Sequence, residues 1–246
     1  MFFIKIKYRK NKRRPELSWY AKTVISTSIA LIIFGTIFLY ISEFSANSAN
    51  RLFNNSLLTS LFQSVTCRTA GFNTVNIAEM TNVSLVIMLF LMFVGGAPGS
   101  CAGGLKITSL RVLIAVTISQ LKGGKQAVIK KVAVSEDAVK KAMVLFLLSV
   151  TIIFIASFLI DFTVAANKPH YQVRGQFLEI LFESVSAFAT VGLSVGITPS
   201  LPAFGKWILI SLMFIGRLGP LLFISALQSV QKVQYYSLPE ENLMIG

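Results

Sequence analysis

Acidic and catalytic side chains are scarce in this sequence. Its 246 residues include 10 Asp and Glu and a single His, against 23 Lys and Arg. An enzyme site needs a nucleophile and a base within reach of each other, and one His with widely separated carboxylates offers no such pair. The sequence also lacks a phosphate-binding motif, so nothing in it points to ATP consumption. We therefore expect a protein that is not an enzyme.

Cysteine is equally rare. The two cysteines, Cys67 and Cys101, lie beside or inside apolar segments and have no metal-ligand spacing. This predicts two small buried thiols and no metal centre. A cleavable signal peptide is not expected either, because the basic N-terminal run is followed by an apolar stretch too long for a signal sequence.

Apolar residues are abundant. The sequence is 54% hydrophobic with 20 Phe, its mean hydropathy is +0.70, and several apolar runs approach bilayer length. The net charge of +13 would suggest nucleic acid in a soluble chain. Here the basic residues cluster beside apolar spans, where they set membrane topology. The sequence therefore predicts an integral membrane protein whose partner is the lipid bilayer, with no nucleic acid.

The basic clusters also predict the topology. We expect spanning helices over residues 19–41, 142–164 and 204–230, and a span that begins near residue 82. Lysine and arginine concentrate in residues 1–18 and in the linker 121–141, which predicts that both segments are cytoplasmic. The tail 232–246 is expected on the same side, so both termini are predicted to be cytoplasmic.

A repeated motif organises the chain. SVTCRTAGFNT at residues 64–74 is matched by SVSAFATVGLS at residues 184–194. Each follows an apolar segment too short to cross a membrane, residues 52–65 and 177–189, and each contains a Thr-X-Gly triplet. Gly adopts backbone angles that let carbonyls turn toward a common axis and replace the water shell of a cation, while the preceding helix adds its negative C-terminal end. The motifs therefore predict two re-entrant pore helices with filter turns.

A glycine-rich break follows the first filter motif. GGAPGSCAGG, residues 95–104, contains five glycines and a proline and is followed by Lys106. It is either a plain loop between two shorter helices or a loop that lines a cavity, and the second is favoured because irregular backbone at membrane depth needs shelter from lipid. Aligning MFVG at residues 92–95 with MFIG at 213–216 makes Arg217 the counterpart of this break. Arg217 predicts an aqueous pore or a polar loop nearby, with a snorkelling cation as the alternative.

The expected fold is an all-α integral membrane protein that resembles a potassium channel. It consists of two tandem units of membrane helix, re-entrant pore helix, filter loop and membrane helix. The predicted divisions are a basic segment 1–18, a first pore unit 19–120 with the loop 95–104, a linker 121–141, a second pore unit 142–231 and a tail 232–246.

Four motifs together resemble the Trk/Ktr/HKT superfamily of potassium transporters. They are CRTAGFNT, MFVGGAPGSCAGGLKITSLR, TVGLS and FIGRLGP, and the ending LPEENLMIG is similar to the bacterial KtrB branch. The similarity covers essentially the whole chain and is KtrB/TrkH-like. Family members carry four pore units around one ion path, and this chain matches the third and fourth. The resemblance therefore implies a truncated or split gene product whose partner is the missing N-terminal half.

The resemblance also implies residue roles. The filter carbonyls that hold potassium would come from Thr69, Ala70, Gly71, Phe72, Thr190, Val191, Gly192 and Leu193. The gate beneath the filter would consist of Gly95, Gly96, Ala97, Pro98, Gly99, Ser100, Gly103, Gly104, Lys106 and Arg217. Glu183, which takes the place of Gln63 in the second pore helix, is expected to be a structural hydrogen-bonding group and not an ion ligand.

The implied function is passive, electrochemically driven potassium uptake across a bacterial plasma (inner) membrane. This chain would be the C-terminal half of the ion-translocating subunit. The resemblance further implies sodium as a regulator or co-ion, a cytosolic nucleotide-binding regulatory ring like KtrA or TrkA, and a homodimer of complete subunits. No covalently bound cofactor is expected.

Two alternatives stay open at this point. A two-filter cation channel could dimerise to complete a pore, which predicts conduction by this chain alone and a dispensable glycine-rich break. A non-conducting accessory half-subunit could instead associate with full-length subunits, which predicts association without restored uptake.

Overall fold

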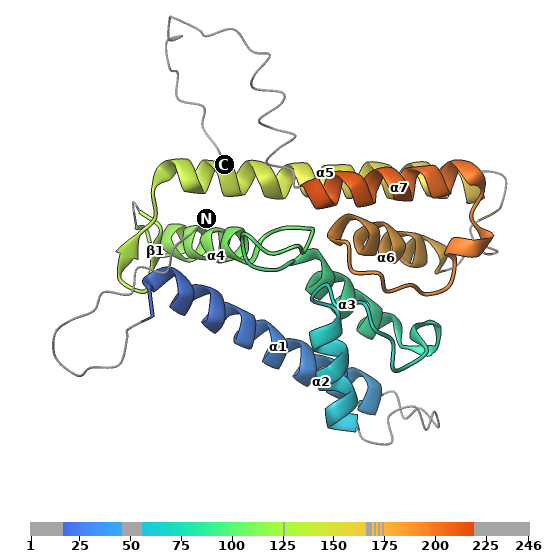
Figure 1. Ribbon diagram of the computed structural model, residues 1–246, viewed down its shortest axis with the longest axis horizontal. Coiled ribbons are helices and arrows are strands. Elements are labelled where there is room, and N and C mark those ends of the chain that lie inside the picture. The colour runs from blue at the N-terminus through green and yellow to red at the C-terminus, as the bar shows by residue number, and fades with distance from the viewer. Residues whose placement is uncertain are drawn as a thin grey trace, which may run out of the picture.

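The chain folds into seven described helices and one short hairpin in a computed structural model (Figure 1). The structure describes residues 17–45, 56–124, 126–165, 169, 171, 173 and 175–218. The helices are α1 (Trp19–Ser45), α2 (Ser56–Thr66), α3 (Asn82–Phe93), α4 (Ile107–Leu121), α5 (Glu136–Ala165), α6 (Gln176–Ala189) and α7 (Ala203–Leu218). The hairpin pairs β1 (Val128–Ile129) with β2 (Val132–Ala133), and the 3-10 turns η2 (Ile77–Glu79) and η4 (Thr198–Ser200) follow the two filter motifs.

Long and short helices alternate along the chain. The segments Trp19–Glu43 and Glu136–Val164 have hydropathies of 2.3 and 2.9 and are long enough to cross a membrane. Helices α2 and α6 contain 11 and 14 residues, so at 1.5 Å per residue they reach only about 17 and 21 Å. Each short helix leads into one of the Thr-X-Gly turns. The order of long helix, short helix, turn and helix therefore occurs twice.

The glycine-rich break interrupts a helix where the sequence predicts it. Helix α3 ends at Phe93 and α4 begins at Ile107, with residues 94–106 between them. Neither helix alone spans 30 Å of hydrocarbon, because 12 and 15 residues give about 18 and 23 Å. Only the two helices together reach that length, so the irregular backbone of residues 94–106 lies between them, partway along the combined span.

One predicted boundary differs in the structure. Helix α5 begins at Glu136 and not at residue 142, and its first turn contains the acidic residues Glu136 and Asp137, which the positive end of a helix favours. The predicted linker 121–141 therefore holds the hairpin and the start of α5. The N-terminal residues 1–16, residues 219–230 of the last predicted span, and the tail 232–246 lie outside the described residues.

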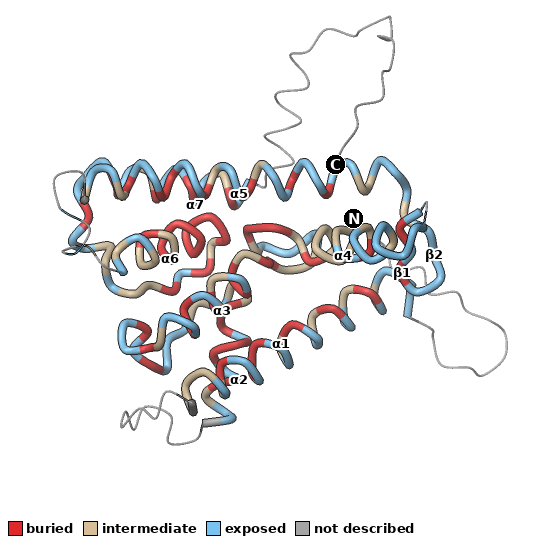
Figure 2. The backbone as a smooth tube through the Cα atoms, turned by 180° about the vertical axis from the view of Figure 1, so that it is seen from behind, coloured by how far each residue is buried: buried red, intermediate tan, exposed pale blue. Residues whose placement is uncertain are grey.

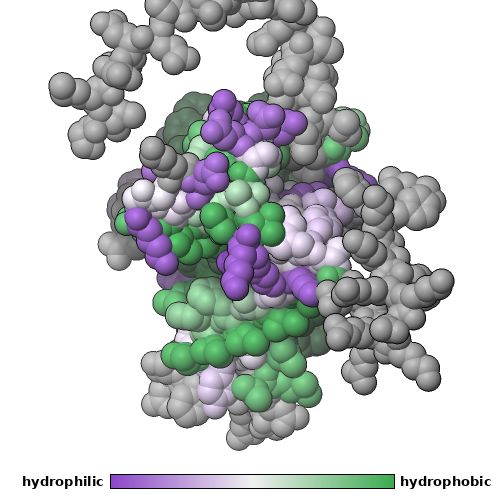
Figure 3. Space-filling view, turned by 90° about the vertical axis from the view of Figure 1, so that its left-hand side faces the viewer, coloured by the Kyte–Doolittle hydropathy of each residue, from purple (hydrophilic) through white to green (hydrophobic). Residues whose placement is uncertain are grey.

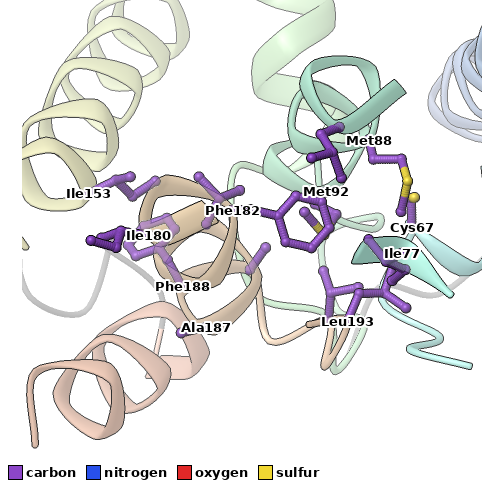
Figure 4. Close-up of a cluster of buried hydrophobic side chains, with 14 of the residues drawn as sticks. Cys67, Ile77, Met88, Met92, Ile153, Ile180, Phe182, Ala187, Phe188 and Leu193 are labelled. Carbon is purple, nitrogen blue, oxygen red and sulfur yellow. The ribbon is translucent and has the colours of Figure 1, made fainter. Parts of the chain in front are cut away.

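The two short helices differ in their surroundings. Helix α6 packs against α3, α5 and α7, and Phe182 and Phe188 on it are fully buried in the main core (Figure 4). Helix α2 packs mainly on α1, and its Leu57 and Leu58 are each 65% exposed. Figure 2 shows the contrast, with α6 largely buried and α2 partly exposed. The first pore helix therefore keeps an uncovered apolar face.

Candidate functional site

The first filter turn is folded by one threonine side chain. Helix α2 ends at Thr66, whose carbonyl accepts hydrogen bonds from the amides of Ala70 and Gly71 at 3.1 and 3.2 Å. The Oγ1 atom of Thr66 accepts from the amide of Phe72 and donates to the carbonyl of Phe72, both at 2.8 Å. Thr66 is buried. These four bonds close the chain from Thr66 to Phe72 into a compact turn.

A carboxylate on α6 binds the segment that follows the second filter turn. Glu183 on α6 is 6% exposed and accepts hydrogen bonds at Oε1 from Ser194 Oγ at 2.5 Å and from the Val195 amide at 3.0 Å. Its Oε2 accepts from Thr198 Oγ1 at 2.9 Å. The geometry agrees with the structural hydrogen-bonding role expected for Glu183, because its contacts go to the segment that leaves the filter.

Both turns use the same unusual backbone. The threonine and the glycine of each triplet have positive φ, at 66° and 77° for Thr69 and Gly71 and at 54° and 93° for Thr190 and Gly192. A β-branched residue in this region costs of order 1–3 kcal/mol, and such strain gathers at functional sites. The sequence predicts this conformation for the glycines, and the structure adds the threonines.

The two turns touch each other. A Cβ atom built on Gly71 would lie 2.1 Å from the carbonyl oxygen of Val191, so only glycine permits this approach. A cavity of about 430 Å³ is lined by all four predicted residues of the second turn together with Glu183 and Arg217. The residues of the first turn do not line this cavity, and Phe72 is 69% exposed. The four residues of the second filter turn therefore line one cavity, and Gly71 of the first turn packs against Val191 of the second.

The glycine-rich loop is closed at its neck. Val94 and Leu105 pair as a parallel bridge, the Gly95 amide donates to the Leu105 carbonyl at 2.8 Å, and the Leu105 amide donates to the Phe93 carbonyl at 3.1 Å. At the tip, the Ser100 amide donates to the Ala97 carbonyl at 3.0 Å. With Pro98 and a Gly99 φ of 89°, the tip has the features of a type II turn.

Two hydrogen bonds connect this loop to the filter turns. The Gly103 amide donates to Thr190 Oγ1 at 3.0 Å, and Arg68 Nη2 donates to the Gly95 carbonyl at 3.1 Å. A Cβ atom on Gly103 would lie 2.9 Å from the Ala189 carbonyl oxygen, so the loop packs directly against the end of α6. The loop is therefore attached to the first turn at its neck and to the second turn near its far end.

Arg68 is a site residue that the sequence reasoning missed. It lies in CRTAGFNT beside the predicted filter carbonyls, yet its partner Gly95 is 27 residues away. Its Nη1 atom is buried and has no hydrogen-bond partner among the described residues. A charged residue inside an otherwise uncharged filter motif was the available signal, because a cation at membrane depth needs an acceptor.

Arg217 lies between the filter and the loop. It occupies the last described turn of α7 and lines the 430 Å³ cavity beside the second filter turn. It also lines a second cavity of about 390 Å³ whose other walls include Pro98, Gly99 and Lys106. Lys106 donates from Nζ to the Ala102 carbonyl at 2.5 Å, within the loop. The structure therefore places both cations at the loop.

The expectation of two buried cysteines is half wrong. Cys67 is buried among the hydrophobic side chains of the core (Figure 4), whereas Cys101 is exposed. The difference follows from the loop, since Cys101 comes directly after the turn at its tip, where no atom lies within 4 Å of the Cβ position of Gly99. Among the described residues, no group of three or more His, Cys, Asp or Glu could hold a metal ion.

Comparison with known proteins identifies the family. Residues 10–231 match the TrkH family, which is described as a cation transport protein. The chain belongs to this family. It is 36% identical over 217 residues to the Ktr system potassium uptake protein B of Bacillus subtilis, and the match covers 87% of this chain and 47% of that protein. It is 33% identical over 237 residues to the potassium/sodium uptake protein NtpJ of Enterococcus hirae, covering 95% of this chain and 51% of that protein.

A solved structure supports the fold. The potassium transporter TrkH of Vibrio parahaemolyticus matches with a TM-score of 0.62 at 20% identity, over 85% of this chain and 44% of that chain. The predicted fold class, an all-α membrane protein of two tandem pore-type units, is confirmed by this likeness and by the helix order. The chain spans about half the length of the curated relatives that it matches.

Proposed function

We propose that this chain supplies two of the filter turns and the gate of a potassium uptake pore. The observation that carries the proposal is the loop 94–106, which is hydrogen-bonded to both Thr-X-Gly turns beneath the ends of two short helices. Backbone carbonyls replace the hydration shell of a cation without any net charge on the protein. Potassium as the permeant ion is supported by the names of the relatives, one a potassium uptake protein and the other a potassium/sodium uptake protein.

The proposed filter residues are the eight of the two turns. Potassium would be held by carbonyls of residues 69–72 and 190–193, with the negative ends of α2 and α6 aimed toward them. The strained threonines and the contact between Gly71 and Val191 support this assignment, because they fix the carbonyl positions from behind. Ion flow would be passive and driven by the electrochemical gradient.

The proposed gate is the loop with Lys106 and Arg217. Its glycine-rich backbone packs against the end of α6, directly below the second turn. The side chain of Arg217 lines cavities on both the filter side and the loop side, where its positive charge would repel a cation that leaves the filter. Movement of the loop and of Arg217 would open the path.

The complete pore requires further filter turns. Two turns surround one side of an ion, and the relatives are about twice the length of this chain. The uncovered apolar face of α2 is the surface where another pore unit would pack. We propose that the remaining turns come from the N-terminal half of the same family, and that complete subunits form a homodimer.

The proposed orientation places both termini in the cytoplasm of a bacterium. The hairpin and the segment before it contain Lys122, Lys130 and Lys131, and basic loops stay on the cytoplasmic side of a plasma membrane. A cytosolic nucleotide-binding ring like KtrA or TrkA would then dock on the hairpin side and act on the loop. Sodium is proposed as a regulator or co-ion.

Rubidium uptake tests the proposed function. The chain is expressed in a bacterial host without its own potassium uptake systems, first alone and then with the N-terminal half of a Ktr-type relative. We expect potassium-limited growth and uptake only with the added half. Uptake by the chain alone would favour the dimerised two-filter channel, and stable association without uptake would favour the accessory half-subunit.

The gate is tested in the assembly that transports. Arg217→Ala and deletion of residues 97–99 are expected to raise flux, because each removes part of the barrier below the filter. Lys206→Ala is the control, since the Lys206 side chain bonds only to the Pro199 carbonyl in the described region, at 3.1 Å. Lower flux at normal expression in both gate variants would contradict the assignment.

A further inference from the structure

A groove between α1, α3 and α4 lies away from the filter and the loop. It has a volume of about 570 Å³ and is walled along most of its length by apolar side chains that include Leu31, Phe34, Phe90 and Ile114. Phe34 and Phe90 make an edge-to-face ring contact across it, with centroids 6.2 Å apart. The groove is therefore wide and apolar enough for a hydrocarbon chain.

One end of the groove is cationic. Arg111 on α4 and Lys130 in the hairpin line it, together with the hydroxyl residues Ser26 and Thr27 on α1, and no acidic residue of the described part of the chain lines it. Figure 3, which faces the hairpin end of the molecule, shows hydrophilic side chains gathered beside a hydrophobic surface. An apolar channel with two cations and hydroxyl groups at its mouth complements an amphiphile with an anionic head.

Arg111 is missing an acceptor. Its Nε atom is buried and has no hydrogen-bond partner among the described residues. A buried donor without an acceptor costs about 1–3 kcal/mol, and more when the group is charged. An anionic oxygen beside the guanidinium would offset this cost through its charge, and guanidinium geometry suits phosphate.

Lys130 is held over the same mouth. Its Nζ donates to the Lys22 carbonyl and to Ser26 Oγ, each at 2.8 Å, which leaves one of the three ammonium donors free for a ligand. The hairpin is fixed to α1 by a bond from Trp19 Nε1 to the Ile129 carbonyl at 3.0 Å. Lys130 also has a φ of 47°, a strained value for a residue other than glycine. The ammonium of Lys130 is therefore placed beside α1 by a turn whose backbone is strained.

We propose that the groove binds an anionic phospholipid, with its phosphate at Arg111 and Lys130 and an acyl chain along Leu31, Phe34 and Phe90. Basic pockets between membrane helices recognise lipid head groups in this way. The site is separate from the proposed ion path, because none of its lining residues lines the filter or loop cavities. Lipid bound here would bridge α1, α4 and the hairpin.

Native mass spectrometry of the purified, delipidated chain tests the proposal. Phosphatidylglycerol and phosphatidylcholine are added in turn, and the affinity of the first retained lipid is measured. We expect a preference for phosphatidylglycerol, and Arg111→Gln and Lys130→Gln should each weaken its binding by about five-fold. Lys131→Gln is the matched control, because Lys131 is the next turn residue but does not line the groove.

A second variant tests the apolar part of the groove, and its thermal unfolding midpoint shows whether the chain still folds. Ala30→Phe fills the groove without changing charge, and should weaken binding of phosphatidylglycerol while the thermal unfolding midpoint stays near that of the parent chain. An equal loss with Lys131→Gln would show a general surface attraction and overturn the site. Equal affinity for the two lipids, or no retained lipid, would also overturn it, the latter in favour of a protein segment that covers the groove.

Discussion

At the scale of single residues, the two filter glycines occupy different environments. Both have positive φ, so alanine costs about 1–2 kcal/mol at either position. Only at Gly71 would the added Cβ also strike a backbone oxygen, 2.1 Å away on Val191, whereas nothing lies within 4 Å at Gly192. Gly71→Ala should therefore reduce the discrimination of rubidium from sodium by about ten-fold or more, which corresponds to about 1.4 kcal/mol. Gly192→Ala should have the smaller effect.

Competition of sodium with rubidium uptake measures this difference. Gly123→Ala is the control for backbone strain alone, because Gly123 has a φ of 68° and open space around its Cα, far from the filter at the end of α4. Equal loss of discrimination at Gly71 and Gly192 would mean that the contact between the two turns has no role in selectivity.

Substitutions of Glu183 distinguish a structural role of its carboxylate from a role in attracting the ion. Its oxygens accept from Ser194, Val195 and Thr198, and a glutamine could keep all three contacts by donating to Thr198 Oγ1. Glu183→Gln should therefore leave the KM for rubidium within about two-fold of the parent, or about 0.4 kcal/mol, because the three contacts are kept and a structural carboxylate does not act on the ion through its charge. Glu183→Leu leaves three donors without an acceptor and should lower the amount of folded protein.

Uptake kinetics and detergent-solubilised yield check both variants. Glu179→Gln is the matched control, since it removes the same charge from the same helix at a partly exposed position without a described side-chain hydrogen bond. A ten-fold rise in KM in Glu183→Gln alone would show that the carboxylate acts on the ion through its charge, and would refute the structural role.

The sequence predicted the residue types of the site better than their partners. The Thr-X-Gly triplets, the glycine-rich break and Arg217 stand out because local chemistry alone makes them unusual in an apolar chain. Arg68 bonds to Gly95 and Thr190 to Gly103, and both pairs form only after separate segments pack together. Spacing along one chain contains no information on such contacts.

At the scale of elements, the loop 94–106 is attached to the second filter turn by a side chain. Thr190→Val keeps the volume of the threonine but removes the Oγ1 that accepts from the Gly103 amide at 3.0 Å. A buried amide left without an acceptor costs about 1–3 kcal/mol, and this cost falls on the position of the loop beneath the filter. Thr190→Val should therefore raise the initial rate of rubidium uptake.

Thr69→Val provides the paired comparison at the other turn. Thr69 has the same left-handed backbone, and its side chain makes no described hydrogen bond to the loop. Initial rates at saturating rubidium should rise in Thr190→Val and not in Thr69→Val. The reverse order, or equal rates in both, would contradict a latch between loop and filter.

Helix existence was predictable, whereas the start of α5 and the hairpin were not. The lengths of the apolar runs predicted the two long helices and the short helices. The glycines and proline of residues 95–104 predicted the interruption after Phe93. The hairpin rests on lysines at positive φ, a position where Asn and Gly are the usual signals, and on the distant bond from Trp19. Tertiary contacts override local preference there.

At the scale of the whole molecule, the two pore helices differ in how they are covered. Helix α6 is enclosed by three helices, whereas Leu58 on α2 is 65% exposed. The repeat in the sequence predicts equal units and so does not predict this difference, which arises because only the second unit is surrounded within this chain. A further pore unit against α2 would restore the symmetry.

Cysteine labelling checks that packing. In a Cys101→Ser background, which removes the exposed native thiol and leaves the buried Cys67, Leu58→Cys should react readily with a lipid-soluble maleimide when the chain is expressed alone. Co-expression of the N-terminal half should slow its labelling by about ten-fold or more, since burial removes the thiol from the reagent and makes it inert. Phe154→Cys, from a residue that is 59% exposed on α5, should label at the same rate in both cases. If labelling at Leu58→Cys is unchanged while uptake is restored, the additional filter turns pack elsewhere, and the apolar face of α2 is covered by lipid in the working pore.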